Sequence, residues 1–98
     1  MAIEILEDVL NSAEELNWRD AIFLPDERSS WGLRSSAKLV PGDELDEDDV
    51  PTSGAIAGLR YAIGVGAVQD VVRNAKAQKT PLPSETLLEA FLFYYDHD

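Results

Sequence analysis

An acidic run near the middle of the chain limits where regular structure can form. Six of the seven positions from residue 43 to residue 49 carry a carboxylate. Like charges at this density repel one another, so the run does not fold on its own. We therefore expect a loop over residues 43–54, which also contains Pro51, Ser53 and Gly54, with the packed elements before and after it. The acidic residues of the run are Asp43, Glu44, Asp46, Glu47, Asp48 and Asp49.

The chain begins with a helical pattern. Over residues 3–17, apolar residues recur at steps of three and four, which places them on one face of an amphipathic helix. They are Ile3, Leu6, Val9, Leu10, Ala13 and Leu16. Trp18 follows this helix, and we expect it to cap the hydrophobic core.

Two short strands are expected between this helix and the acidic run. The apolar residues Ala21–Leu24 form the first, and Pro25 ends it because proline lacks the N–H that a central strand donates. A polar turn follows at residues 26–30. The chain is then extended over residues 31–40, with Ala37–Val40 as the second strand. We expect the two strands to pair in antiparallel orientation.

A third strand and two helices are predicted after the acidic run. Residues 59–63 alternate as in a strand, so that Leu59, Tyr61 and Ile63 share one side. Gly64-Val65-Gly66 then turns the chain into a helix. The core face of this helix carries Val68, Val71, Val72 and Ala75. Its water-facing residues are expected to be Gln69, Asp70, Arg73, Asn74 and Lys76.

The last helix is separated from this one by two prolines. Pro81 and Pro83 break the preceding helix, and Ser84 is a favourable N-cap for the next one. The final helix has a broad apolar stripe, formed by Leu87, Leu88, Phe91, Leu92 and Tyr95.

This order of elements, one helix, three strands and two helices, is typical of the α+β class. We expect a small, mostly antiparallel three-stranded sheet covered by about three helices. The chain has 98 residues, enough for one hydrophobic core, so residues 1–98 are expected to form a single domain.

The net charge indicates which classes of partner the chain can bind. The chain holds 19 acidic and 8 basic residues, which gives a formal net charge of −11. The field of such a protein repels nucleic acid and anionic membranes and attracts cationic partners. Acidity of this kind also serves simply to keep a small protein soluble. We therefore expect a cationic partner and no binding to nucleic acid or membrane.

Residue usage also points to a cellular compartment. The chain contains no cysteine, which excludes disulfides, thiolate zinc sites and a cysteine nucleophile. The N-terminus carries Glu4, Glu7 and Asp8, where a signal peptide has positive charge. No apolar run approaches the ~20 residues of a membrane span. These features predict a cytoplasmic protein.

Two motifs resemble ligand sites without matching them. Gly64-Val65-Gly66 is similar to the start of a dinucleotide-binding turn, but the position of the third glycine holds Gln69. A calcium-binding EF-hand loop counted from Asp43 needs glycine at its sixth position and glutamate at its twelfth. The chain has Asp48 and Gly54 there. We expect a tight turn, a solvated loop, no cofactor and no metal.

The residues of a catalytic set are also missing from the sequence. His97 is the only histidine, and the chain contains no G-x-S-x-G motif. The carboxylates lie mostly in polar runs, where solvent keeps them ionised, whereas a general acid needs an apolar pocket. We therefore predict that the protein is not an enzyme.

Charge and aromatic content supply the candidate partner-binding residues. Tryptophan and tyrosine are common interface anchors and equally common core residues. Trp18 and Tyr95 are assigned to the core, whereas Trp31 lies among polar residues and both environments stay open for it. We predict that the six acidic residues of the run contact the partner, followed by Asp26 and Glu27, together with Trp31.

Four segments of the chain resemble a family of short acidic bacterial proteins of unassigned domain function. They are Trp18–Pro25, Tyr61–Val65, Val68–Ala75 with Gln78-Lys79, and Tyr94–Asp98. That family includes immunity proteins encoded beside polymorphic toxins. The whole chain is similar to an immunity protein of a contact-dependent growth inhibition system. The resemblance covers most of the length and marks no active site.

This resemblance implies that the chain binds and neutralises the C-terminal toxin domain delivered by a neighbouring cell. Toxins of this kind are often nucleases, including tRNA nucleases, and a nuclease needs a cationic groove to hold its polyanionic substrate. The acidic residues of this chain are of the charge that such a groove attracts. The alternative is a small regulatory or adaptor protein that binds a partner other than a toxin.

Overall fold

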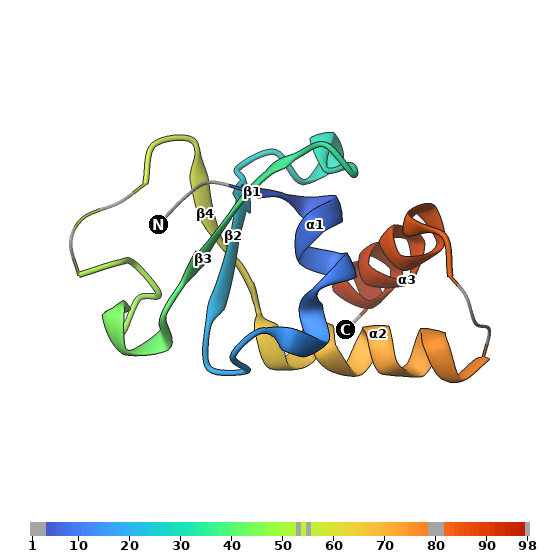
Figure 1. Ribbon diagram of the computed structural model, residues 1–98. Coiled ribbons are helices and arrows are strands. Elements are labelled where there is room, and N and C mark those ends of the chain that lie inside the picture. The colour runs from blue at the N-terminus through green and yellow to red at the C-terminus, as the bar shows by residue number, and fades with distance from the viewer. Residues whose placement is uncertain (1–3, 53, 55, 79–81, 98) are drawn as a thin grey trace.

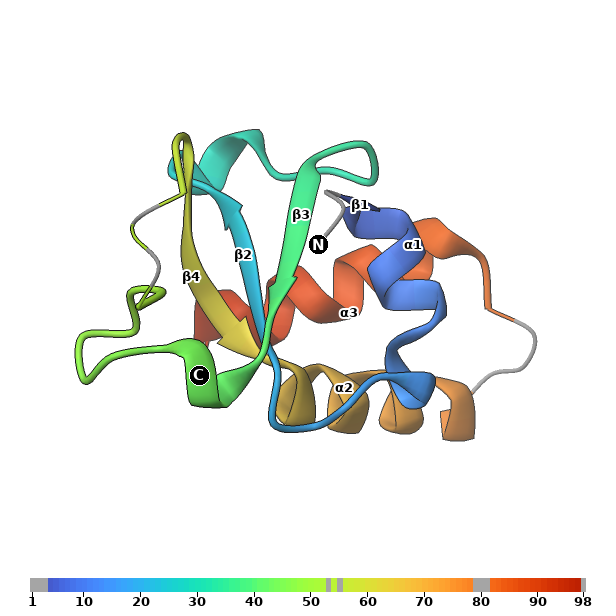
Figure 2. The same ribbon diagram turned by 60° about the vertical axis from the view of Figure 1, so that its left-hand side comes forward.

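The computed structural model describes residues 4–52, 54, 56–78 and 82–97. In this part of the chain a small sheet has its helices on one face and the segment after its third strand on the other (Figure 1). The turned view shows the same division (Figure 2). The sequence predictions that involve Ile3, Ser53, Lys79, Pro81 and Asp98 fall outside the described residues.

The elements alternate between strand and helix before the sheet is complete, and two helices then follow. Short 3₁₀ turns, labelled η, link several of them. In chain order they are β1 (Glu4–Ile5), α1 (Leu6–Asn11), η1 (Ala13–Glu15), β2 (Ala21–Pro25), η2 (Arg28–Ser30), β3 (Ser36–Val40), η3 (Gly42–Glu44), β4 (Leu59–Gly64), α2 (Val65–Gln78) and α3 (Ser84–His97).

The sheet has four strands in the order β1-β3-β2-β4, and all neighbours are antiparallel. Ala21, at the start of β2, pairs with Val40 on one side and with Gly64 on the other. The α+β class and the antiparallel pairing of the two predicted strands are confirmed. The prediction of three strands is wrong, because the sheet has a fourth, β1.

The additional strand comes from residues that were predicted to be helical. Glu4 pairs with Ala37, and Ile5 pairs with Ser36. The next N–H group, that of Leu6, donates to the Ser35 carbonyl at 2.8 Å. The first N–H groups of a helix have no partner within it, so bonding to the chain before β3 satisfies one of them and fixes α1 to the sheet edge.

The N-terminal helix is also shorter than its periodicity predicts. The apolar residues from Leu6 to Ala13 are buried on one side as expected, yet α1 ends at Asn11 and the chain continues as η1. The Ser12 hydroxyl donates to the Asp8 carbonyl at 2.7 Å. Such a side-chain bond competes with regular helical hydrogen bonding, so one apolar face is shared by a helix and a 3₁₀ turn.

A β-bulge changes the faces of β4. Ile22 pairs with Ile63 but Phe23 pairs with Tyr61, so Ala62 has no partner of its own on β2. The extra residue in a bulge shifts the alternation of side chains by one. Ile63 therefore joins the core on the helical side, and Tyr61 packs its ring against Phe23 on the other side. The prediction that Leu59, Tyr61 and Ile63 share one side is wrong for Ile63.

The strand β4 passes directly into α2, as the tight turn at Gly64-Val65-Gly66 predicts. The N–H groups of Val65 and Gly66 donate to the carbonyls of Asp20 and Trp18, at 2.9 and 3.2 Å. These bonds hold the start of α2 against the segment that leads into β2.

The core-facing residues of α2 are largely as predicted, with one exception. Val68, Val71 and Val72 are buried. Gln69, expected to face water, is only 6% exposed. Its amide donates to the carbonyls of Ala13 and Leu16, at 3.0 and 2.8 Å. A buried amide is stable there because its two N–H groups find acceptors in the carbonyls at the end of the 3₁₀ turn.

The last helix begins one residue earlier than the capping pattern suggests. Ser84, predicted to be the N-cap, is the first residue of α3. Its hydroxyl accepts a hydrogen bond from the Asn11 amide at 3.2 Å, which joins α3 to the end of α1. Leu87 and Phe91 of the predicted stripe are buried in the core between the helices and the sheet. Tyr95 packs against that core, as predicted.

The two tryptophans have opposite environments. Trp31 is 7% exposed, and its indole N–H donates to the Pro25 carbonyl at 2.9 Å. Its ring contacts those of Phe91 and Tyr95, with centroids 6.1 and 4.7 Å away. Trp18 is 64% exposed, so the prediction that it caps the core is wrong. Its backbone is held by α2, and this directs its side chain outward.

No helix in the described part of the chain has both the length and the apolar character needed to cross a membrane.

Candidate functional site

The face of the sheet opposite the helices carries a second, smaller apolar cluster. Its buried members are Ala21, Phe23 and Val40, and Leu45, Ile56 and Leu59 pack against them. Leu45 lies within the acidic run, and Ile56 follows it. The segment between β3 and β4 is therefore attached to the sheet by its own apolar residues, although it contains the six carboxylates of the acidic run.

The acidic loop, residues 43–52, has a folded backbone. Leu45 and Pro51 form an antiparallel bridge, and the Asp46 N–H donates to the Val50 carbonyl at 2.8 Å. The Asp46 carboxylate accepts from the N–H groups of Asp48 and Val50, at 2.8 and 3.0 Å. Asp49 completes the turn with a φ of 61°, a conformation that Asp and Asn tolerate better than most residues. Asp46 thus stabilises the loop that carries the other acids.

The beginning of the acidic loop is fixed by a close backbone approach. Gly42, the first residue of η3, lies against the Arg19 carbonyl, and a Cβ atom at this position would overlap with that oxygen. Only glycine allows the two segments to approach so closely. This contact places η3 beside the segment that carries Trp18.

All six acidic residues of the loop are exposed. The ion pairs among the described residues join Arg28 to Asp96, Arg73 and Lys76 to Glu14, and Arg73 to Asp70. These pairs lie among η1, η2, α2 and α3, on the helical side, and the acidic loop takes part in none of them. The six loop carboxylates therefore form a cluster of negative charge on the loop side of the sheet.

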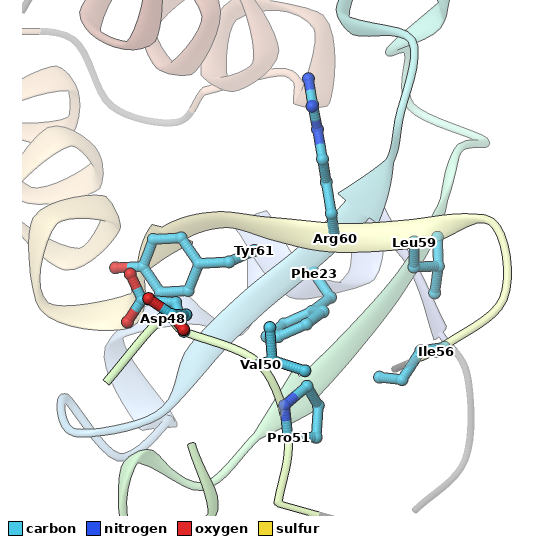
Figure 3. Close-up of a pocket in the computed structure, with 9 residues that line it drawn as sticks. Phe23, Asp48, Val50, Pro51, Ile56, Leu59, Arg60 and Tyr61 are labelled. Atoms are coloured by element: carbon cyan, nitrogen blue, oxygen red, sulfur yellow. The ribbon is translucent and has the colours of Figure 1, made fainter. Parts of the chain in front are cut away.

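Two adjoining pockets lie between the acidic loop and the sheet. The first has a volume of about 340 Å³ and is formed by Phe23, Val50, Pro51, Ile56, Leu59 and Tyr61, with Asp48, Asp49 and Arg60. Figure 3 shows Phe23 and Tyr61 extending into this pocket from the strands, and Val50 and Pro51 lining it from the loop. The second has a volume of about 400 Å³ and includes Trp18, Arg19 and Asp43. Both pockets include Asp49 and Tyr61, so they form one continuous surface.

Large apolar side chains are exposed on this surface. Trp18 is 64% exposed, Tyr61 37% and Val50 36%. The Arg19 guanidinium lies over the Trp18 ring, 5.3 Å from its centroid, which orients that ring. We refer to the six acids of the loop with Trp18, Val50 and Tyr61 as the acidic face. Phe93, another exposed aromatic residue, lies on α3 and stacks on His97, with ring centroids 4.3 Å apart.

Tyr61 lies at the centre of the acidic face. Its ring meets that of Phe23 edge to face, with centroids 6.1 Å apart. Partial burial raises the pKa of its hydroxyl above the ordinary tyrosine value, and the negative charge of Asp49 raises that pKa further. Both effects keep the hydroxyl protonated, so it remains a hydrogen-bond donor.

The remaining predicted partner-binding residues lie elsewhere. Asp26 and Glu27 are exposed but follow Pro25, at the end of β2 opposite to the residue that pairs with Val40. Trp31 is in the core on the helical side. The structure therefore groups the six acids of the run with each other and separates them from these three residues.

Three members of the acidic face were not among the predicted contacts. Trp18 has the polar neighbours Asn17, Arg19 and Asp20, a signal of exposure that the helical pattern before it outweighed. Val50 follows the acidic run directly. No feature of the sequence indicated that Tyr61 lies on this face, because its position there results from the bulge in β4.

In the described residues, no group of three or more histidine, aspartate or glutamate side chains is arranged to hold a metal ion.

A domain family of unknown function, DUF7716, matches residues 3–98. The match covers nearly the whole chain, so the chain belongs to this family. No curated protein and no solved structure gives a significant match.

Proposed function

We propose that this member of the DUF7716 family is an immunity protein, which neutralises a cationic toxin domain by stoichiometric binding. The observation that carries the proposal is the acidic face, where a loop with six exposed carboxylates lies beside exposed apolar residues. The resemblance to immunity proteins of contact-dependent growth inhibition systems, seen in four sequence segments, supplies the biological setting. On this proposal the protein acts in the cytoplasm and catalyses no reaction.

The chemistry of the acidic face suits protein binding. Tryptophan and tyrosine are enriched among the residues that contribute most to interface affinity, and they are commonly surrounded by polar residues that exclude water. Trp18 and Tyr61 line the two pockets here, and the loop carboxylates of Asp43, Asp48 and Asp49 line them as well. The apolar residues would supply most of the affinity, and the charges would speed encounter and select the partner.

The expected target is a nuclease, with an RNase as the first candidate. An enzyme that cleaves RNA must hold a chain of phosphates, so its groove carries positive charge. The carboxylates of the acidic face would compete with those phosphates for the same groups. Binding at the groove would block the enzyme by occlusion.

The proposal is tested with the gene directly upstream of the one that encodes this chain. We expect it to encode a large exported protein with a variable C-terminal domain. Expression of that domain alone should stop growth, and co-expression of this chain should restore it. Continued killing in the presence of folded, soluble protein would contradict the proposal.

The contribution of the acidic face is tested with two aromatic variants. Trp18→Ala is expected to raise the Kd for the toxin domain by about 30-fold, the effect of losing one interface anchor. Phe93→Ala is the matched control, because Phe93 is also an exposed aromatic residue but lies on the helical side. Calorimetric titration of both variants measures the difference. A larger loss of affinity from Phe93→Ala than from Trp18→Ala would place the binding surface on the helical side, which would contradict the proposed role of the acidic face.

A further inference from the structure

We infer that the first pocket of the acidic face receives an arginine side chain of the partner. This inference rests on the proposed function, since it names the group that a cationic partner would insert. The pocket combines an apolar wall with two carboxylates at its edge. The apolar wall suits the methylene stem of an arginine side chain, and the carboxylates suit its guanidinium head.

The wall of the pocket fits the stem. Phe23, Pro51, Leu59 and Tyr61 provide apolar surface on both sides of a volume of about 340 Å³. This volume is at the small end of ligand pockets, which hold molecules from about 300 Å³ upward. A single long side chain therefore suits it better than a larger ligand. The methylene groups of arginine bury readily along such a surface while the charged head stays near water.

The edge of the pocket fits the head. Asp48 and Asp49 are consecutive, exposed and part of the pocket lining. In Figure 3 Asp48 lies on the same side of the pocket as Tyr61, and the Arg60 side chain extends away from Phe23, Val50 and Pro51. The charge of the protein's own Arg60 therefore does not occupy the space beside those carboxylates.

Arginine suits this edge better than lysine. The guanidinium group binds carboxylates through two parallel hydrogen bonds and also stacks on aromatic rings. The pocket offers both kinds of partner, carboxylates from Asp48 and Asp49 and the ring of Tyr61. The lysine ammonium group, a compact and strongly hydrated point charge, gains less from a flat ring.

The inference is tested by NMR titration of the full chain with small blocked amino acids. The probes are N-acetyl-arginine methylamide, the corresponding citrulline compound, which has the same shape without the charge, and the lysine compound. We expect the arginine probe to shift the methyl signals of Val50 and Leu59 and the ring signals of Tyr61. Its Kd should be about fivefold lower than that of citrulline, which is the difference that one exposed ion pair provides. Lysine should bind between the two.

Two double variants assign the charge effect to the edge of the pocket. Asp48→Asn with Asp49→Asn should remove the preference for arginine over citrulline, and asparagine tolerates the backbone conformation of position 49. Glu44→Gln with Glu47→Gln removes the same charge from residues outside the pocket lining and should preserve the preference. Val50→Trp, which fills the pocket without altering charge, should weaken binding of all three probes.

Equal binding of arginine and citrulline would overturn the inference. Equal effects of the two double variants would do the same, because the probe would then respond only to net charge. Tighter binding of lysine than of arginine would also contradict it. These experiments use no toxin, so failure to bind the arginine probe leaves the growth-rescue result untouched, and failure of rescue leaves the probe result untouched.

Discussion

A single buried amide joins the N-terminal segment to α2. The Gln69 side chain donates to two carbonyls of the chain around η1, those of Ala13 and Leu16. Its side chain lies in the region where α2 packs on η1, next to the turn that leads to Trp18. The position of Trp18 on the acidic face therefore depends partly on a buried residue.

Replacement of this amide should destabilise the fold. Gln69→Leu keeps the approximate size of the side chain but removes the side-chain donor to the Leu16 carbonyl and one of the two donors to the Ala13 carbonyl. We expect it to lower the free energy of unfolding by about 1–3 kcal/mol. Gln78→Leu, at an exposed position of the same helix, should change that free energy by less than about 0.5 kcal/mol. Urea unfolding followed by circular dichroism measures both. A loss of similar size in the two variants would show that the Gln69 hydrogen bonds contribute little.

The Tyr61 hydroxyl gives a pH-dependent signal from the acidic face. Its pKa is raised mainly by burial and further by Asp49. Asp49→Asn should therefore lower this pKa but leave it above the ordinary value, because the effect of burial remains. Glu47→Gln, an acid outside both pockets, should leave it almost unchanged. An NMR titration of the Tyr61 ring measures the shift, and equal shifts in the two variants would contradict the assigned role of Asp49.

The sign of the associated stability change follows from the direction of the shift. A group whose pKa is higher in the folded state adds stability that is complete below its unfolded pKa, here the ordinary value of 10.0, and that is lost as the pH rises through the folded pKa. The free energy of unfolding should therefore fall above pH 10.0, and Tyr61→Phe should reduce that fall.

Among the elements, η3 has an attachment that leaves no room for a side chain at Gly42. Gly42→Ala should push η3 away from the Arg19 carbonyl and lower the free energy of unfolding by about 1–3 kcal/mol, a typical cost of overpacking. Gly32→Ala is the matched control, because a Cβ atom at that position meets nothing within 4 Å, and it should change stability by less than about 0.5 kcal/mol. Thermal unfolding compares the two. Equal melting temperatures for both variants would mean that the loop moves aside without cost.

The two C-terminal helices could be predicted from their apolar repeats, whereas the division of residues 4–15 into a strand, a helix and a 3₁₀ turn depends on tertiary contacts and could not. The core faces of α2 and α3 follow from spacing because each helix packs on a single core. The two-residue strand β1 is too short for a repeat and exists because residues 36 and 37 pair with it. The bulge at Ala62 depends on the pairing with β2, so the side on which Tyr61 lies could not be read from alternation.

At the scale of the molecule, the arrangement of charge matters more than its amount. The net charge of −11 and the acidic run are visible in the sequence, but the run could have lain on either face of the sheet. The helices cover one face and the acidic loop crosses the other (Figure 1). The exposure of Trp18 and Tyr61 beside it follows from packing, so the apolar part of the candidate site became apparent only in three dimensions.

We predict that the location of the acids, and not only their number, controls the rate of association with the toxin domain. Two variants with the same net charge separate these effects. The loop variant combines Asp43→Asn, Glu44→Gln, Glu47→Gln and Asp48→Asn. It retains Asp46, whose carboxylate stabilises the loop backbone. The helical-side variant combines Asp8→Asn, Glu15→Gln, Glu85→Gln and Glu89→Gln, all at exposed positions.

The most direct test is the association rate with the toxin domain, measured by stopped-flow fluorescence between 0.01 and 0.15 M salt, where screening changes strongly. At the lowest salt the loop variant should associate about tenfold more slowly than the unmodified chain and with a weaker dependence on salt. The helical-side variant should stay close to the unmodified chain. Equal slowing in both variants, or none in the loop variant, would contradict the claim that the acidic face guides and binds a cationic partner.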